Sequence, residues 1–438
     1  MFGRDIFGKM DIILIGAVFV AVAFGIMMIY SAGFDPVEQI NKGLYKKQII
    51  WFIIGIIFMT MMSIFNYRQL GDYSLYIYGF VIFIVLITTV FGRPIRGTSA
   101  WLSFGFFSIQ PSEFMKLAVV IVLAKYLELR ERDIKNFREL LIPTMFVLVP
   151  VLIILKQPDF GTAAIFIPVL FTMLFMGGAD VSHLVSIILI AIIALVFPMM
   201  YTYWEWAGYK GSSIIVQMFV HLDVLFTISG VLLFIAVSTF IMHFFFNQSF
   251  LRKIYIPATV ISLGLMMSVV IHKWFKEYQK KRILVFLNPD LDPHGSGYNI
   301  IQSKVAIGSG GFFGKGFLQG TQTQLGFLPE KTSDFIFPVI AEELGFAGAI
   351  IAIALLGVII YRGMEIALGT RDKFGALLAT GITAILFFHI LINIGMVIGI
   401  MPVTGLPLCF FSYGGSNLFM VMISVGILNN ISMNRSLY

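Results

Sequence analysis

The fold is decided by one polar stretch, residues 282–337, which reads RILVFLNPDLDPHGSGYNIIQSKVAIGSGGFFGKGFLQGTQTQLGFLPEKTSDFIF. It is the longest part of the chain that cannot sit in hydrocarbon, and apolar segments lie on both sides of it. Nine glycines and many Asn, Gln and Asp residues alternate there with Phe, Leu and Ile. A loop of this length is usually functional or disordered. Because the apolar residues can anchor it, we expect an ordered and functional loop.

The chain as a whole is too apolar to be a soluble protein. Of its 438 residues, 59% are hydrophobic and 12% are charged, whereas roughly a quarter of the residues in soluble domains are charged. The mean hydropathy is +0.94. We therefore expect an all-α polytopic membrane protein in which residues 1–438 form a single transmembrane domain.

Apolar runs of about 20 residues, the length that a bilayer core requires, predict a bundle of about twelve transmembrane helices. The first run is long and many more follow it, so we expect an uncleaved helix rather than a signal peptide. The expected spans are residues 11–32, 48–65, 75–91, 113–129, 140–155, 162–176, 183–203, 224–246, 254–274, 335–361, 374–400 and 412–431.

The basic residues of the short loops predict which side of the membrane each loop faces. Cytoplasmic loops carry an excess of Lys and Arg, and these residues gather at 130–138, 252–253, 362–373 and 435. Both termini are then cytoplasmic, and residues 276–334 form a large extracytoplasmic loop. The net charge of +7 has the same cause, so it does not indicate a nucleic-acid partner.

Metal and nucleotide chemistry find little support in the sequence. The single cysteine and the six histidines show no zinc-type spacing. We therefore predict no metal site and identify no cofactor, while a divalent cation stays an open alternative. The run GSGGFFGKG, residues 308–316, lacks the Ser or Thr that follows Lys in a phosphate-binding loop and the third glycine of a dinucleotide fingerprint.

Polar side chains gather at the predicted outer edge of the membrane. Ionisable groups at membrane depth cost roughly 2.5 to 3.5 kcal/mol each and tend to mark function. Glu113 and Lys116 lie three residues apart, hence on one helix face where they can pair. The alternative is a pair that extends to the membrane interface without further function. Other candidates expected on the same outer side are Arg96, Gln110, Gln157, Asp159, Gln302 and Asp334.

These residue types suit a substrate with a phosphate head group and a lipid tail. Arg and Lys match phosphate oxygens, and the carboxylates stay free for acid–base chemistry. Within the loop, Asp290 and Asp292 are both candidates, and one of them is expected to be a turn residue. Glu342 and Glu343 are expected to be structural partners of basic side chains. The residues by themselves do not name the reaction.

Long motifs follow one another along nearly the whole chain: GTSAWLSFGFFSIQPSEFMKLA, KQPDFGTA, DPHGSGYNIIQSKVAIGSGGFFGKGF, GTQTQLGFLPEKTSDFIF and NIGMVIGIMPVTGLPLCFFSYGGSNL. In content and order they resemble the SEDS family (shape, elongation, division and sporulation), membrane proteins that build the bacterial cell wall. The sequences GTQTQLGFLPE and MPVTGLPL resemble those of the RodA-like elongation branch more than those of the FtsW-like division branch.

The resemblance implies a peptidoglycan glycosyltransferase of the bacterial cytoplasmic (inner) membrane. It would polymerise lipid II into glycan strands during cell elongation and release undecaprenyl pyrophosphate. The family's loop aspartate, which precedes Pro-x-Gly-x-Gly-Tyr, is here Asp292, so Asp292 is the expected catalytic residue and Asp290 the turn residue. Glu113 and Lys116 match the family's polar pair on the cavity wall. The other candidates would line or support this substrate-binding cavity.

The resemblance also implies partners. One is a class B penicillin-binding protein, a transpeptidase that crosslinks the product, and the MreB cytoskeleton of the rod complex would be an indirect partner. Alternatives for the function are a lipid II flippase or transporter, a scaffold for other wall enzymes, and an FtsW-like division polymerase. The transporter alternative is weakened because no internal repeat is visible in the sequence.

The chain departs from the family pattern in three places. Residues 205–263 look like an inserted two-helix segment added to a core of about ten helices. It is either a lineage insertion without further role or a hairpin that contacts a partner or lipid. Thr332 and Ser333 stand where a His-Thr pair is commoner in the family, and Cys409 stands where Pro is commoner.

Overall fold

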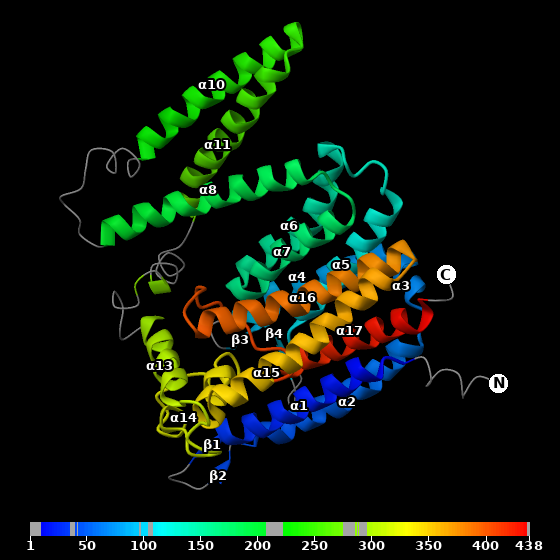
Figure 1. Ribbon diagram of the computed structural model, residues 1–438, viewed down its shortest axis with the longest axis vertical. Helices are drawn as coiled ribbons and strands as arrows, with labels where there is room; N and C mark the ends of the chain where they lie inside the picture. The colour runs from blue at the N-terminus through cyan, green and yellow to red at the C-terminus, as the bar shows by residue number, and fades with distance from the viewer. Residues whose placement is uncertain are drawn as a thin grey trace. The chain divides into compact units, whose positions relative to one another are not determined.

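The computed structural model describes residues 10–35, 40–41, 43–95, 98–103, 108–206, 222–274, 285–286, 288 and 296–435. Within these ranges the chain is almost entirely helical (Figure 1), so the all-α prediction is confirmed. The strands of the described residues form two small antiparallel sheets. One pairs β1 (Phe34–Asp35) with β2 (Ile40–Asn41), and the other orders β3 (Arg93–Ile95), β4 (Thr98–Ser103) and β5 (Ser108–Ile109).

Ten helices of the described chain are long and apolar enough to cross a membrane, which makes the protein a multi-pass membrane protein. Two further expected spans are helical but fall outside this set. Helix α7 (Phe160–Met176) is apolar but shorter, and α5 (Pro111–Leu129) carries four charged side chains. The expected total of about twelve spans therefore stays a prediction. The ten helices are α1 (Ile12–Ala32), α2 (Leu44–Ile64), α4 (Ser74–Phe91), α6 (Leu141–Lys156, after the short turn Phe137–Leu140), α8 (Val181–Trp206), α10 (Leu222–Phe246), α11 (Ser249–Trp274), α15 (Ile336–Gly369), α16 (Lys373–Val397) and α17 (Gly415–Asn434).

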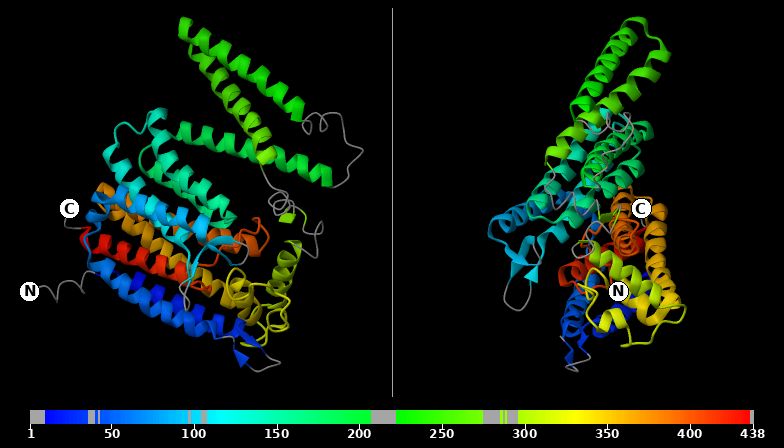
Figure 2. Two further views of the ribbon diagram at one scale, coloured as in Figure 1. Left: turned by 180° about the vertical axis from the view of Figure 1, so that it is seen from behind. Right: turned by 90° about the vertical axis from the view of Figure 1, so that its left-hand side faces the viewer.

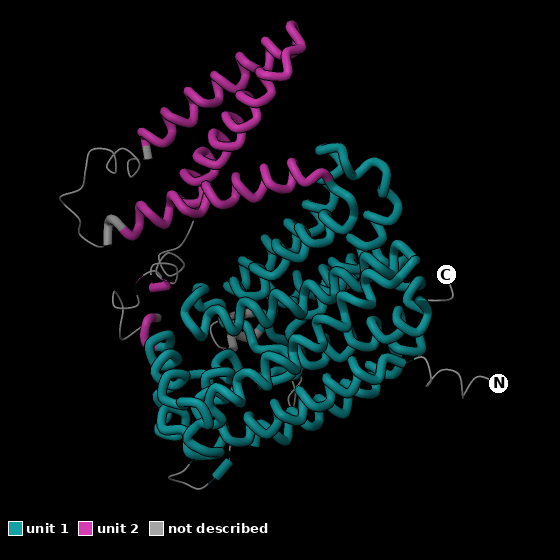
Figure 3. The backbone as a smooth tube through the Cα atoms, viewed as in Figure 1, with its two compact units in different colours: residues 1–179, 299–438 teal, residues 180–298 magenta. Residues whose placement is uncertain are grey.

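The chain divides into two compact units (Figure 3), residues 1–179 with 299–438 and residues 180–298. In the first unit, α5, α16 and α17 form the interior, because most of their side chains are buried. Helix α17 packs along α2, and α16 packs on α5, α7 and α15. Gly426 lets α17 approach α2 closely, since a Cβ there would clash with the carbonyl oxygen of Met59.

The start of α1 and the end of α17 lie at the same end of the first unit (Figure 2). The backbone N–H of Asp11 donates to Asn429 of α17 across 2.9 Å. The side chain of Asp11 caps α1 through the amide of Leu14 and also accepts from Arg362 of α15. Helix α15 continues past residue 361, where the expected span ends, to Gly369.

Helix α15 is interrupted at Gly345, whose backbone adopts φ 67° and ψ −165°. An interruption leaves carbonyl groups before it and amide groups after it without helical partners. The preceding loop satisfies both sets. The amides of Lys315 and Gly316 donate to the carbonyls of residues 342 and 343, and the amides of residues 346 and 347 donate to the carbonyls of residues 311 and 312. These backbone hydrogen bonds join residues 311–316 of the loop to residues 342–347 of α15, as in a pair of short strands.

The loop before α15 contains α13 (Ser296–Ser309) and the single turn α14 (Thr321–Gln324). The hydroxyl of Ser303 donates to the carbonyl of Val397 across 2.6 Å, which ties α13 to the end of α16. Most of residues 275–295 lie outside the described part of the chain. The expected extent of the loop, 276–334, and its extracytoplasmic side stay predictions.

The second unit contains α8, α10 and α11. Helix α11 packs on both other helices, with a hydrogen bond of 2.8 Å from Ser262 to the carbonyl of Ser229 on α10 and an edge-to-face contact between His272 and Tyr201 of α8. Helix α10 and part of α11 fall within residues 205–263. That this segment is an insertion, with or without a role in docking, stays a prediction.

Candidate active site

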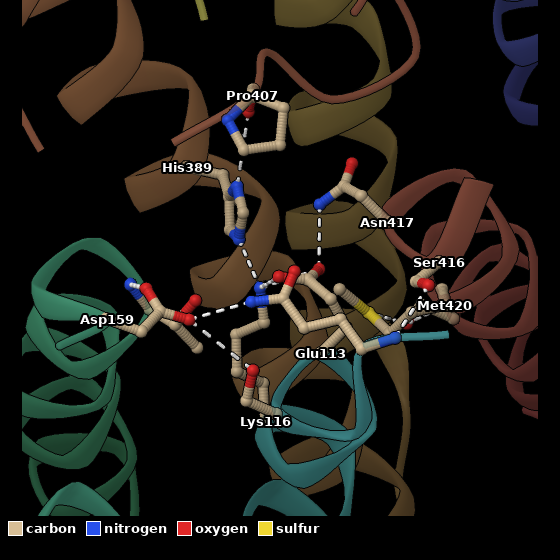
Figure 4. Close-up of polar contacts among 12 residues, drawn as sticks. Glu113, Lys116, Asp159, His389, Pro407, Ser416, Asn417 and Met420 are labelled. Atoms are coloured by element: carbon tan, nitrogen blue, oxygen red, sulfur yellow. Dashed lines mark hydrogen bonds and ion pairs between the residues drawn. The ribbon is translucent and has the colours of Figure 1, made fainter. Parts of the chain in front are cut away.

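A buried ion pair on α5 forms the centre of the candidate site (Figure 4). The ammonium of Lys116 lies 2.9 Å from both carboxylate oxygens of Glu113, as the spacing of three residues predicts. The side chains are only 1% and 3% exposed, respectively. The amide of Asn417 on α17 donates to Glu113 across 2.9 Å, and Nε2 of His389 on α16 lies 2.6 Å from Lys116 Nζ. Three helices are thus joined by one polar cluster.

The N-terminal ends of three helices meet beside this cluster. Gln110 precedes α5, and its side-chain amide donates to Asp159 across 2.7 Å. Asp159 caps α7, because its other carboxylate oxygen accepts from the amide of Thr162 at 3.0 Å. The backbone N–H of Gln110 donates to the hydroxyl of Ser416, in the first turn of α17. Helix N-termini carry a partial positive charge, so the starts of α5, α7 and α17 together favour an anionic group.

Asp159 lies in the short connection between α6 and α7. Burial raises the pKa of its carboxyl group above the ordinary value, and the hydrogen bond from the Thr162 amide opposes this shift. The ionised form of the Asp159 carboxyl group is therefore stabilised by the hydrogen bonds that it accepts from Gln110 and Thr162. Its observed role is to hold the starts of α5 and α7 together.

The connection between α16 and α17 passes over the same region. A Cβ on Gly161 would lie 2.5 Å from the carbonyl oxygen of Thr404, so only glycine fits at this point of α7. Asn393 donates to the carbonyl groups of Asp334 and Leu406 at 2.9 and 2.6 Å. The connection therefore packs on α7 and is hydrogen-bonded to α16. Asn393 also joins α16 to Asp334, which lies just before α15.

One protein-family model matches almost the whole chain. The family model described as "Cell cycle protein", which covers FtsW, RodA and SpoVE, matches residues 11–212 and 210–437. The chain belongs to this family. The predicted membership of the SEDS family is confirmed, and the chain is a bacterial multi-pass membrane protein.

Named relatives of this SEDS protein match over almost their full length. Peptidoglycan glycosyltransferase RodA of Treponema pallidum is 33% identical over 97% of this chain and 98% of its own. Peptidoglycan glycosyltransferase MrdB of Escherichia coli is 31% identical over 95% of this chain and 91% of its own. A solved chain from work on polymerization and crosslinking by a peptidoglycan synthase complex is similar with a TM-score of 0.68 and 26% identity, covering 97% of this chain and 98% of that chain.

Of the remaining predicted site residues of this SEDS protein, three lie in the described part of the chain and three lie outside it. Gln157 is fully buried, and its amide donates to the carbonyl of Val85 and the hydroxyls of Thr88 and Thr89, so it joins the end of α6 to α4. Gln302 is half-buried on α13, and Asp334 precedes α15 near Gly405. The candidates Arg96, Asp290 and Asp292 lie outside the described residues.

Two polar residues of the cluster are absent from the sequence-based candidates. His389 lies within the apolar run FFHILI, whereas Asn417 follows the polar residues Ser412, Tyr413 and Ser416. Each is separated from residues 113–116 by about 270 residues or more along the chain. The signal in the sequence is a polar side chain within a predicted span, which is costly unless it has a partner. That signal marks each residue but does not identify its partner.

Glu342 anchors the loop rather than joining the cluster. Its carboxylate accepts from Lys315 at 2.9 Å, from the amides of Gln322 and Thr323 at 2.8 and 3.0 Å, and from the hydroxyls of Thr321 and Thr323. The expectation of a basic partner is confirmed for this residue. The neighbouring Glu343 accepts from the hydroxyl of Ser31 on α1.

Proposed function

We propose that this SEDS protein is a peptidoglycan glycosyltransferase that polymerises lipid II into glycan strands and releases undecaprenyl pyrophosphate. The observation that carries the proposal is the buried Glu113–Lys116 pair beside three helix N-termini, in a chain whose full-length relatives bear the name peptidoglycan glycosyltransferase. A buried ammonium group and helix N-termini both favour an anion. The pyrophosphate of a lipid-linked sugar is such an anion.

The proposed reaction is an inverting displacement. The 4-hydroxyl of one sugar attacks the anomeric carbon of another, the bond from that carbon to the pyrophosphate oxygen breaks, and the proton of the hydroxyl passes to a base. One carboxylate suffices, because pyrophosphate leaves without being protonated. We assign this role to Asp292, either as the base or as the group that orients the hydroxyl. The assignment rests on its place in the motif DPHGSGY.

In the proposed cavity, Lys116 supplies positive charge for the departing pyrophosphate, and Glu113 holds Lys116 in place. Lys116 is buried, so its charge acts through a medium of low dielectric constant, where electrostatic interactions are stronger than in water. Gln110 and Asp159 keep the starts of α5 and α7 together beside it. We assign supporting or lining roles to Arg96, Gln157, Gln302 and Asp334.

We further propose that the polymerase serves cell elongation. The support is the RodA-like sequence of its motifs and the 33% identity to RodA of Treponema pallidum. The alternative is an FtsW-like role in division. The proposed partner is a class B penicillin-binding protein, supported by the similarity to a chain from a peptidoglycan synthase complex. In this proposal both termini and the indirect contact with MreB are cytoplasmic, and residues 276–334 are extracytoplasmic.

The proposal is tested with purified protein and labelled lipid II, alone and together with a class B partner. Glycan strands of many disaccharide units and one undecaprenyl pyrophosphate released for each bond formed are the expected products. The flippase alternative predicts a different result in liposomes. Labelled lipid II would then cross the bilayer without forming strands under any of these conditions, and that result would refute the proposed activity.

A further inference from the structure

His389 is a buried imidazole in an apolar helix. It lies within the run FFHILI on α16, and its side chain is fully buried. Transferring a polar group into such surroundings is costly unless it finds hydrogen-bond partners. The two ring nitrogens therefore need an explanation.

Both ring nitrogens face polar atoms (Figure 4). Nε2 lies 2.6 Å from the ammonium nitrogen of Lys116, and Nδ1 lies 3.5 Å from the carbonyl oxygen of Pro407. An ammonium group donates hydrogen bonds and cannot accept them, so Nε2 must present its lone pair. The hydrogen is then on Nδ1 and points at Pro407. This assigns one tautomer of a neutral imidazole.

The contact with His389 completes the hydrogen bonding of Lys116. An ammonium group has three hydrogens. Two of them are directed at the two oxygens of Glu113, and the third is directed at His389. Without the lone pair at Nε2, one hydrogen of a buried cation would lose its acceptor, and the direction of the ammonium group would no longer be fixed.

The other side of the ring links Lys116 to the connection between α16 and α17. Pro407 follows Leu406, whose carbonyl group accepts a hydrogen bond from Asn393. A few residues earlier in the same connection, Thr404 packs on Gly161 of α7. His389 therefore stands between the cation and the segment that passes over the starts of α7 and α15. The ring contacts Lys116 closely, at 2.6 Å, and Pro407 more loosely, at 3.5 Å.

We propose that His389 is a positioning residue for the transferase reaction, which acts through Lys116: its Nε2 lone pair fixes the third hydrogen of the ammonium group, and its Nδ1 hydrogen keeps that arrangement in register with the α16–α17 connection. This inference rests on the proposed glycosyltransferase function. It adds a residue that the sequence motifs did not indicate and gives it a defined tautomer.

The test compares two amide substitutions. Gln places its terminal oxygen about where His has Nε2, whereas Asn places its side-chain amide about where His has Nδ1. His389→Gln should therefore keep the acceptor for Lys116 and retain most of the polymerisation rate with lipid II. His389→Asn should lose it, and kcat should fall about tenfold or more, the effect expected for one charge-assisted hydrogen bond, with a smaller change in KM.

Thermal unfolding of both variants in the same detergent separates positioning from folding. His389→Asn should unfold at a lower temperature than His389→Gln, because a hydrogen of the buried ammonium group loses its acceptor. Both variants should still be folded at the assay temperature and differ greatly in kcat. Equal kcat values for the two variants, or a loss of kcat that only matches the fraction of protein unfolded at the assay temperature, would overturn the inference. Failure of the wild-type protein to polymerise lipid II would instead refute the proposed function, so the two failures are distinguishable.

A second measurement does not depend on activity. In a Lys116→Met background the acceptor at position 389 has no hydrogen to receive, so adding His389→Asn should change the unfolding midpoint less than it does in the wild-type background. Equal changes in both backgrounds would show that His389 acts independently of Lys116 and would contradict the proposal.

Discussion

Replacing Lys116 by Met should destabilise the protein by about 3 to 5 kcal/mol, the usual cost of removing one partner from a buried ion pair. The substitution leaves the carboxylate of Glu113, which is 3% exposed, with only the hydrogen bond from Asn417 among the contacts described above. It also removes the donor that faces Nε2 of His389. Both losses act in a protein interior where water cannot replace the missing partner.

The same helix offers a matched control. Lys125 and Glu128 have the same spacing of three residues and an N–O distance of 2.8 Å, but both side chains are 28% exposed. An exposed pair of this kind contributes about 0 to 1 kcal/mol. Lys125→Met should therefore cost several-fold less than Lys116→Met, although the charge removed is identical.

The double variant Glu113→Leu with Lys116→Met separates stability from function. Removing both charges leaves no unpaired ion, so at least half of the stability lost in Lys116→Met should return. Activity should not return. The free energies are measured by denaturation in mixed micelles, with all four proteins in one detergent. Equal costs for Lys116→Met and Lys125→Met, or a double variant less stable than Lys116→Met, would refute the argument that the buried charge pair determines this effect.

Three further contacts are tested by substitution. Asp159→Ala removes the cap of α7 and should cost about 1 to 2 kcal/mol, whereas Asp159→Asn should keep most of it; equal stability of the two variants would contradict the capping role. Gly161→Ala places a Cβ 2.5 Å from the Thr404 carbonyl and should cost about 1 to 3 kcal/mol in thermal unfolding, whereas Gly79→Ala, with nothing within 4 Å, should be neutral or stabilising; a neutral Gly161→Ala would refute the close approach. Glu342→Gln weakens the ion pair with Lys315 and should speed tryptic cleavage of the loop; an unchanged cleavage rate would show that Glu342 does not anchor it.

The positions of the helices are predictable from the sequence, because the length and hydropathy of an apolar run are local properties. The ends of the helices are less predictable, because contacts with residues far away in the sequence influence them. Helix α2 begins at Leu44, four residues before the expected span. Gln48 in its first turns is buried, and its side-chain amide donates a hydrogen bond to the carbonyl of Ser412. Likewise α15 extends beyond the expected span to Gly369, and its Arg362 pairs with the distant Asp11. A sequence window cannot see a partner that lies hundreds of residues away.

The same distinction applies to the site. The pairing of Glu113 with Lys116 follows from helical spacing alone, and the structure has it. The contacts of Lys116 with His389 and of Glu113 with Asn417 depend on how α5, α16 and α17 pack, which no local pattern encodes. Gln157 and Asp159 are neighbours in sequence, yet their side chains contact α4 and Gln110 respectively. Closeness along the chain was a poor guide there.

The proposed mechanism requires the loop carboxylate of Asp292 for lipid II polymerisation. The most direct measurement is the rate of glycan-strand formation by purified wild-type, Asp292→Asn and Asp290→Asn proteins with lipid II and a class B partner. Because a general base contributes about 10²- to 10⁴-fold, Asp292→Asn should lose activity by at least two orders of magnitude, while Asp290→Asn should retain it. Equal polymer from wild-type and a folded Asp292→Asn protein would show that Asp292 is not the catalytic residue.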